Sequence, residues 1–170
     1  GRKLGPVDRL WLIVQAERYG TRRGDIGGLL KRLDIIPPSL ALAQAAEESG
    51  WGTSRFVREG NAIFGQWVFP RRDNLAPRRR DDGKNHHIKA FASLFDSVRA
   101  YARNLNTHGA YKDFRAKRAA LRRGGMPLDG ATLAKTLRRY SERGSGYIES
   151  IRRIITTNDL GGLDGARLNE

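Results

Sequence analysis

The sequence predicts a mainly α-helical fold of the α+β class, with a helical lobe and a small β-hairpin or flap lobe. Three observations lead to this prediction. Apolar residues recur at helical spacing in most segments, Gly and Pro separate these segments, and residues 63–69 and 87–91 alone have strand-like spacing. A chain of 170 residues without a convincing linker can bury one core, so we expect residues 1–170 to form a single domain.

The first expected helix covers residues 8–19 and ends at Gly20. Four of its apolar residues stand at near-helical spacing: Leu10, Ile13, Val14 and Ala16. A short apolar segment follows Asp25. The next helix is expected to start near Pro38, because proline disfavours a helical conformation in the residue before it and fits the first helical turn.

The helix from Pro38 to Gly50 is apolar almost all round over its first two turns, which is typical of a buried central helix. Its few polar residues include Gln44, Glu47 and Glu48. Beyond Gly50, Thr53 is expected to cap a short helix that runs through Glu59.

The remaining elements follow a flap at about residues 66–91. One helix is expected to start at Ser93 or Asp96 and to end near residue 106. Three more are expected at residues 113–123, 129–140 and 146–157, and residues 158–170 are expected to form a polar tail.

Composition excludes several kinds of protein. No apolar run approaches the roughly 18 residues of a membrane span. The absence of Cys excludes disulfide frameworks and cysteine nucleophiles, and three His give no support to a metal site, so we expect neither metal nor cofactor. The chain starts Gly-Arg-Lys-Leu without the apolar stretch of an export signal, and we expect it to be a portion of a longer protein.

The formal net charge of +14 is concentrated in three segments. Residues 71–90, 112–123 and 138–153 carry +4, +5 and +3. This balance predicts a polyanionic partner, and the candidates are nucleic acid, an anionic membrane face or a bacterial wall polymer. The alternative is that each cluster is simply the solvated face of a helix.

Glu48 is the strongest candidate for a catalytic group. It sits one turn after Gln44 at the end of the apolar helix and is followed by Ser-Gly-Trp51-Gly. A carboxyl group there must be paired or face a cleft, because its charged form is costly to desolvate. Partial burial beside an aromatic residue favours the protonated form, which is the form that a general acid requires. The alternative is that Glu47 and Glu48 form surface ion pairs with Arg55 or Arg58.

Four blocks in the sequence resemble the peptidoglycan-cleaving glucosaminidases of glycoside hydrolase family 73, and the Bax-type branch in particular. The blocks are Pro38–Phe56, which contains Glu-Glu-Ser-Gly-Trp-Gly, then Glu59–Trp67, Ser97–His108 and Tyr140–Tyr147. They occur in family order, and the likeness spans about residues 27–157. The resemblance implies a lysozyme-like fold and makes Glu48 the general acid and Glu47 its neighbour.

The resemblance also implies roles for other residues. Tyr147 takes the place of the family's active-site tyrosine, where its phenol could contact the substrate's N-acetyl group or developing charge; its alternative role is helix packing. Aromatic faces and amides are expected to line the substrate cleft, at Gln44, Trp51, Asn61, Phe64, Gly65, Gln66 and Trp67. For Phe64 the alternative is core packing.

The sequence offers several candidates for the second catalytic group. Glycosidases commonly use two carboxylates, about 5–5.5 Å apart in retaining and 6.5–9.5 Å apart in inverting enzymes. The candidates are Asp73, Asp81 and Asp82, whereas His87 stands where the resemblance leads us to expect an acidic residue. The alternatives are the substrate's own acetamido group or a water molecule without a strong base.

The resulting functional prediction is a peptidoglycan hydrolase that cleaves after N-acetylglucosamine. The alternatives are a muramidase or lytic transglycosylase on the same glycan, or a non-catalytic basic module that binds wall polymer or nucleic acid. Expected partners are peptidoglycan glycan strands and anionic wall polymers; nucleic acid is not expected, because the aromatic residues do not alternate with the Arg runs. We expect a monomer that acts in the periplasm or outside the cell, either in wall remodelling or as a delivered antibacterial effector.

Overall fold

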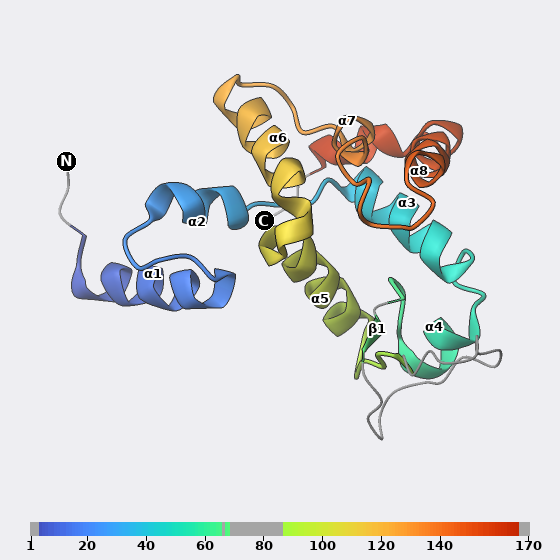
Figure 1. The fold of residues 1–170 in the computed structure, drawn as a ribbon, viewed down its shortest axis with the longest axis horizontal. Helices are drawn as coiled ribbons and strands as arrows, with labels where there is room; N and C mark the ends of the chain where they lie inside the picture. Colours follow the sequence, from blue (N-terminus) through green and yellow to red (C-terminus); the bar gives the residue numbers. More distant parts are fainter. Residues whose placement is uncertain (1–3, 66, 69–86, 167–170) are drawn as a thin grey trace.

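The structure is a computed structural model that describes residues 4–65, 67–68 and 87–166 (Figure 1). It is mainly helical, as predicted. The α-helices are α1 Pro6–Tyr19, α2 Ile26–Arg32, α3 Pro38–Ser49, α4 Arg55–Gly60, α5 Leu94–Thr107, α6 Lys112–Arg123, α7 Gly130–Ala134 and α8 Ser145–Thr157. Two 3-10 helices, η1 Gly109–Tyr111 and η2 Leu160–Gly165, and two short strands, β1 Trp67–Val68 and β2 His87–Ile88, complete the described elements.

Helix α3 is the centre of the fold, and α7, α8 and η2 pack around it (Figure 1). Pro38 occupies the start of α3, and Gly50 ends it in the left-handed conformation. Leu40, Ala43 and Gln44 are all fully buried, as expected for an apolar helix with neighbours on several sides. The burial of α3 determines where its last turn, and therefore Glu48, is held.

The N-terminal end of α3 is secured by a residue far away in the sequence. The Asp164 carboxylate in η2 accepts hydrogen bonds from the Ser39 backbone N–H at 2.8 Å and the Ser39 hydroxyl at 2.7 Å. It also accepts a bond from the Gly130 backbone N–H at 2.8 Å, at the start of α7. One side chain thereby satisfies one backbone N–H group at the start of each of two helices, α3 and α7. Residues 160–165 are therefore a packed element, whereas the sequence had predicted a polar tail for residues 158–170.

Two arginines of the basic segment 112–123 are buried and hold helices together. Arg118 is fully buried and donates to the backbone carbonyls of Lys31 and Ile35 at 2.9 and 2.8 Å. Arg115 donates to the carbonyls of Leu105 and His108, both at 2.9 Å. Burial lowers the pKa of Arg118 to about 10, so the side chain stays charged at neutral pH. Part of this predicted charged surface is thus internal structure.

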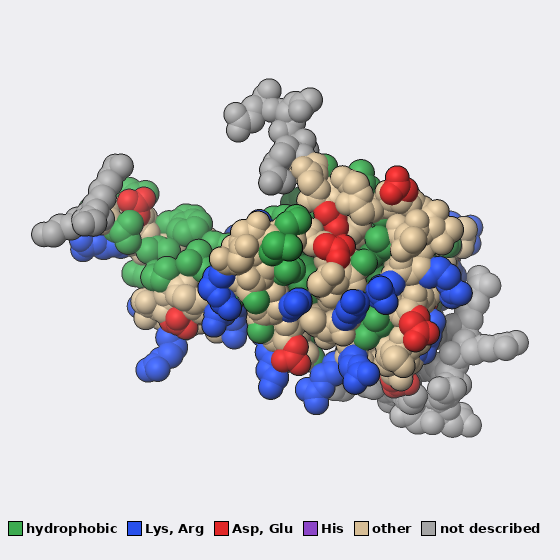
Figure 2. All heavy atoms as spheres, turned by 90° about the horizontal axis from the view of Figure 1, so that it is seen from above, with side chains coloured by type: hydrophobic (Ala, Val, Ile, Leu, Met, Phe, Trp, Pro, Cys, Tyr) green, Lys and Arg blue, Asp and Glu red, His purple; other side chains and the backbone are tan. Residues whose placement is uncertain are grey.

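The apolar residues at helical spacing in the first helix do not all face the core. Ala16 is buried, but Leu10 and Val14 are exposed, together with Val7 and Trp11 at the same helical spacing. In Figure 2, apolar side chains gather over the part of the molecule that α1 and α2 form at the left of Figure 1. Helical periodicity identified residues that share a face, but it could not show which face α2 covers.

The predicted β-hairpin lobe is not seen among the described residues. Strand structure there is limited to an antiparallel pairing of β1 with β2, in which Trp67 lies opposite Ile88 and Val68 opposite His87. Residues 63 and 64 lie in a turn. The flap itself, predicted for about residues 66–91, lies mostly outside the described residues.

Two helix boundaries also differ from the prediction. Ser54, not Thr53, caps α4, because its hydroxyl accepts from the Val57 N–H while the Thr53 hydroxyl donates back to the Gly50 carbonyl. Helix α7 ends at Ala134, whereas residues 129–140 were predicted to be helical. Beyond Ala134 the backbone N–H groups of residues 136, 137 and 140 bond to carbonyls three residues back, which tightens the chain into turns.

The close approach of α7 to α3 depends on Gly130. A Cβ atom there would lie 2.1 Å from the Ser39 hydroxyl and 2.8 Å from the Leu40 backbone nitrogen. We expect Gly130→Ala to lower the free energy of unfolding by about 1–3 kcal/mol, because a backbone atom cannot move aside cheaply. Urea denaturation measures this. Gly146→Ala, whose Cβ meets nothing within 4 Å, is the control and should be close to neutral; equal stabilities for the two variants would contradict the packing described here.

Candidate active site

Glu48 lies in the last turn of α3, where its carboxyl group is partly buried. One of its oxygens faces the backbone of Gly65, because a Cβ atom on Gly65 would lie 3.8 Å from Glu48 Oε2. Gly65 has a positive φ of 52°, a conformation that glycine adopts without steric cost. The family-like Phe-Gly turn therefore approaches the carboxyl group through its backbone.

Tyr147 is the other predicted catalytic residue, and the structure brings it to Glu48. It lies in the first turn of α8, and its hydroxyl is hydrogen-bonded to the Glu48 carboxyl group. The same hydroxyl accepts a bond of 2.8 Å from Gln44 Nε2, and Gln44 Oε1 accepts one of 2.8 Å from the Tyr101 hydroxyl. Two residues predicted to contact substrate, Gln44 and Tyr147, are 0% and 2% exposed, so Tyr147 reaches Glu48 from inside the protein and Gln44 is linked to Glu48 only through Tyr147.

Aromatic rings enclose this group of side chains. Tyr147 stacks on Tyr140 with ring centroids 5.4 Å apart, and Tyr140 contacts Tyr111 at 5.9 Å. On the other side Tyr101 stacks on Phe64 at 3.9 Å with the planes within 8° of parallel. The rings exclude water from the inner side of Glu48 and lower the local dielectric response.

The surroundings favour the protonated form of Glu48. Burial raises the pKa of Glu48 above its ordinary value, and the neighbouring charge of Glu47 raises it further. The Tyr147 hydrogen bond and the positive charge of Arg143 act in the opposite direction without reversing the shift. A carboxyl group with these properties can donate a proton at a pH where an ordinary glutamate would be ionised.

Glu47 has the opposite environment although it is the adjacent residue. It forms an ion pair with Arg143 and accepts a hydrogen bond of 2.8 Å from the Ser150 hydroxyl. Partial burial alone would raise its pKa, but the bonds from Arg143 and Ser150 hold the pKa of Glu47 below the ordinary value. The ion pairs of Glu47 and Glu48 with Arg55 or Arg58, which were the alternative considered from the sequence, do not form among the described residues. Arg55 pairs with Glu59 at 2.9 Å.

Three predicted cleft residues have different surroundings. Phe64 is buried in the core against Tyr101, which agrees with its alternative role in packing. Asn61 ends α4 in the left-handed conformation and donates to the Phe91 carbonyl at 3.0 Å, so it ties together the two ends of the intervening segment. Trp51, in the turn after α3, is 64% exposed and free to stack on a ligand.

The remaining candidates cannot be located relative to Glu48. Gln66, Asp73, Asp81 and Asp82 lie outside the described residues, and Trp67 and His87 are placed only as members of the strand pair. Within residues 4–65 and 87–166, no set of three or more His, Asp or Glu side chains is arranged to hold a metal ion. No helix of the described chain combines the length and apolar character that crossing a bilayer needs.

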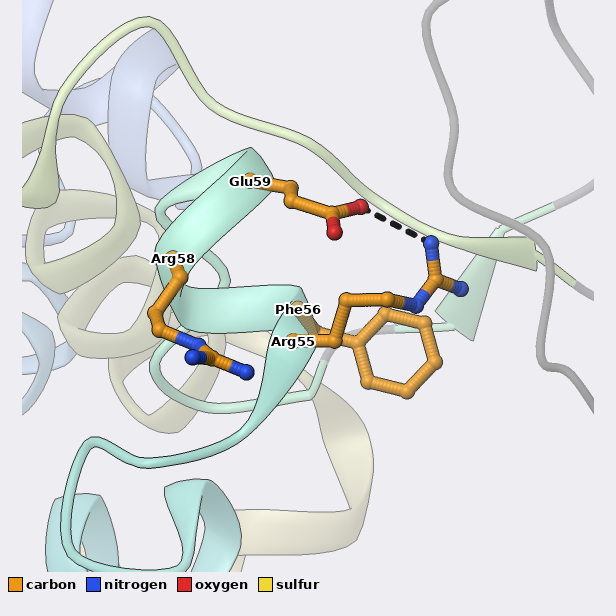
Figure 3. A pocket seen from close by; sticks show the side chains of 4 residues that line it. All are labelled: Arg55, Phe56, Arg58 and Glu59. Carbon is orange, nitrogen blue, oxygen red and sulfur yellow. Dashed lines mark hydrogen bonds and ion pairs between the residues drawn. The ribbon is translucent and has the colours of Figure 1, made fainter.

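A separate hollow of about 240 Å³ opens on α4. Arg55, Phe56, Arg58 and Glu59 line it, and Figure 3 shows the Arg55 guanidinium turned toward Glu59. None of these four side chains was predicted to bind substrate.

Comparison with known proteins identifies the family. The model of the Glucosaminidase family, described as mannosyl-glycoprotein endo-β-N-acetylglucosaminidase, matches residues 28–160. The chain belongs to the glucosaminidase family of glycoside hydrolases. This confirms the family resemblance that the four sequence blocks indicated. The matched region begins in α2 and ends at the start of η2, so it contains both Glu48 and Tyr147.

A curated relative supports this membership, and a solved structure shares the fold. The chain is 39% identical over 148 residues to the protein Bax of Escherichia coli strain K12; the match covers 84% of the chain and 52% of Bax, so the chain spans about half the length of that relative. Its fold resembles the catalytic domain of the autolysin Auto from Listeria monocytogenes, with a TM-score of 0.57 and 17% identity over 96% of this chain and 90% of the other.

The site contains residues that sequence reasoning had not singled out. Tyr101, Tyr140 and Arg143 all lie within family-like blocks, yet no role was predicted for them. Their connection with Glu48 depends on how α5 and α8 pack against α3. A polar group inside a helix's apolar stripe, as Tyr101 is in α5, is the signal that could have drawn attention to a buried hydrogen bond.

The two adjacent glutamates Glu47 and Glu48 should affect stability in opposite directions. Glu48 has a raised pKa in the folded state, so it costs stability as pH rises above 4.5 through that pKa; Glu48→Gln should therefore raise Tm at neutral pH by a few degrees, and the gain should vanish at acidic pH. Glu47 has a lowered pKa, so its stabilisation is present above pH 4.5 and is lost as pH falls through the folded value.

Glu47→Gln should accordingly lower Tm at neutral pH. Thermal denaturation of both variants from pH 4 to pH 8 measures the two effects. A loss of Tm in Glu48→Gln at neutral pH, similar to that in Glu47→Gln, would show that Glu48 is an ordinary paired carboxylate.

Proposed function

We propose that this chain is a peptidoglycan hydrolase that cleaves the glycosidic bond after N-acetylglucosamine, with Glu48 as the general acid. The observation that carries the proposal is the partly buried Glu48 carboxyl group, whose pKa is raised and which is bonded to Tyr147 at the end of the central helix. Membership of the glucosaminidase family supports the choice of sugar. The name of the structural neighbour, an autolysin, supports the bacterial wall as substrate.

The reaction needs a proton on the oxygen that leaves the anomeric carbon. Glu48 would donate that proton, and the resulting carboxylate would accept the hydrogen bond of Tyr147. Trp51 is exposed next to Glu48 in the sequence, and its indole would stack on a sugar ring of the glycan.

The group that completes the reaction at the anomeric carbon is a second part of this proposal. Asp73, Asp81 and Asp82 remain the candidates from the chain, and the acetamido group of the substrate is the candidate from the ligand.

The working place would be the cell wall, in the periplasm or outside the cell. The net charge of +14 favours association with anionic wall polymers even though Arg115 and Arg118 are internal. In Figure 2 Lys and Arg side chains are spread across one face of the molecule, which suits a partner with charge distributed along a polymer.

Replacing Glu48 by Gln should remove the proton donor while keeping the shape of the side chain. We expect turnover of purified peptidoglycan to fall by about 10²–10⁴-fold, the usual contribution of a positioned general acid. The measurement is mass spectrometry of the released fragments after borohydride reduction of the new ends. Wild type should give reduced glucosamine ends, and Glu48→Gln should give almost none.

Glu47→Gln is the matched control, because it alters the adjacent carboxyl group by the same change, and it should keep most of the turnover. Substantial release by Glu48→Gln would contradict the role of Glu48. Reduced muramic acid ends would indicate a muramidase, anhydromuramic ends a lytic transglycosylase, and binding without release a non-catalytic module.

A further inference from the structure

Three buried uncharged side chains form an unbroken chain of hydrogen bonds that ends at Glu48. The Tyr101 hydroxyl donates to Gln44 Oε1, Gln44 Nε2 donates to the Tyr147 hydroxyl oxygen, and the Tyr147 hydroxyl is bonded to Glu48. We propose that Tyr101 and Gln44 are positioning residues, which determine that the hydroxyl proton of Tyr147 points at the Glu48 carboxyl group. The inference rests on the proposed function, in which Glu48 is the acid.

The direction of each bond follows from the number of protons available. A phenol has one proton to donate, and a carboxamide has a donor end and an acceptor end. Because Tyr101 gives its proton to Gln44 Oε1, the NH₂ end of Gln44 faces Tyr147. The Tyr147 oxygen then accepts from Gln44, and its own proton is left for Glu48. With the carboxamide reversed, Tyr147 would donate to Gln44 and Glu48 would lose its donor.

The surroundings keep this arrangement in place. Gln44, Tyr101 and Tyr147 are at most 2% exposed, so solvent water does not compete for their bonds. The ring of Tyr101 is stacked on Phe64, and that of Tyr147 on Tyr140. Burial and the nearby Glu48 raise the pKa of Tyr147 far above its ordinary value, so Tyr147 keeps its proton and no proton passes along the chain.

This arrangement would matter when Glu48 gives up its proton. The new carboxylate receives the Tyr147 hydrogen bond, which lowers the pKa of Glu48 and opposes the effect of burial. Other groups that act on Glu48 from the elements around it are Glu47, Arg143, Tyr101, Tyr111 and Tyr140. Of these, Tyr101 alone is joined to Glu48 through Gln44 and Tyr147.

Tyr101→Phe tests the role of the first member by removing one oxygen atom and leaving the stacked ring. The pH dependence of kcat/KM on peptidoglycan is measured. The alkaline limb of this pH profile, where Glu48 loses its proton, should shift to higher pH by about 0.4–1 unit, which is the effect of one ordinary hydrogen bond. Tyr147→Phe, which removes the direct donor, should move it at least as far.

Tyr111→Phe is the matched control. Its hydroxyl is bonded to Asn104 instead of Gln44, and it is also a buried tyrosine near Glu48. Its alkaline limb should coincide with that of wild type. The inference would be overturned if the alkaline limb of Tyr101→Phe lay at the same pH as that of wild type. It would also be overturned if Tyr101→Phe and Tyr111→Phe shifted that limb equally.

A second measurement separates this inference from the proposed function. The stability gained by Glu48→Gln is followed from pH 4 to pH 9 in the wild-type and Tyr101→Phe backgrounds, and it needs no activity. In the Tyr101→Phe background the gain should level off at a higher pH, because Glu48 keeps its proton longer. If neither wild type nor any variant releases fragments from peptidoglycan but the stability profile still shifts, only the proposed function fails. If fragments are released but neither the kcat/KM profile nor the stability profile shifts in Tyr101→Phe, only the positioning role fails.

Discussion

The properties of the candidate active site depend on the desolvation of one carboxyl group, that of Glu48. Helix α3 is surrounded by α7, α8 and η2, and Glu48 is carried to the edge of that core on its last turn. Water can solvate the group only in part, while Tyr147 supplies one hydrogen bond from inside. Removal of water favours the acid, and the tyrosine bond favours the carboxylate. The group is thus suited to donating a proton and remaining stable afterwards.

The rest of the fold serves the placement of that group. Asp164 bonds to both Ser39 and Gly130 and so joins η2, α3 and α7 at the end of α3 opposite Glu48. Arg118 and Arg115 satisfy backbone carbonyls where α6 meets the preceding segments. Glu47, bonded to Arg143 and Ser150, secures the last turn of α3 to α8, which carries Tyr147. Glu47 is therefore paired with a cation, whereas Glu48 has no cationic hydrogen-bond partner among the described residues.

Sequence patterns predicted the helices and the pair Glu48 and Tyr147, because apolar periodicity and the four family-like blocks are local features of the chain. They did not predict the covered face of α1, the buried Arg118 or the role of Asp164, because each depends on contacts between residues far apart in the sequence. Gln44 and Phe64 belong to the predicted set, yet they serve Glu48 from the core instead of lining the substrate cleft. Residue type and spacing predicted several of the residues that gather near Glu48, but not the side of Glu48 on which each of them lies.

Direct titration of Glu48 is the simplest test of whether the pKa of this carboxyl group is raised in the folded protein. The carboxyl carbon of Glu48, labelled with ¹³C and assigned by comparison with Glu48→Gln, can be followed by NMR from pH 3 to pH 9. The account predicts that Glu48 titrates at a higher pH than an ordinary glutamate and that Glu47 titrates at a lower one. An ordinary or lowered pKa for Glu48 would mean that the group is ionised at working pH, and it would contradict its role as the acid.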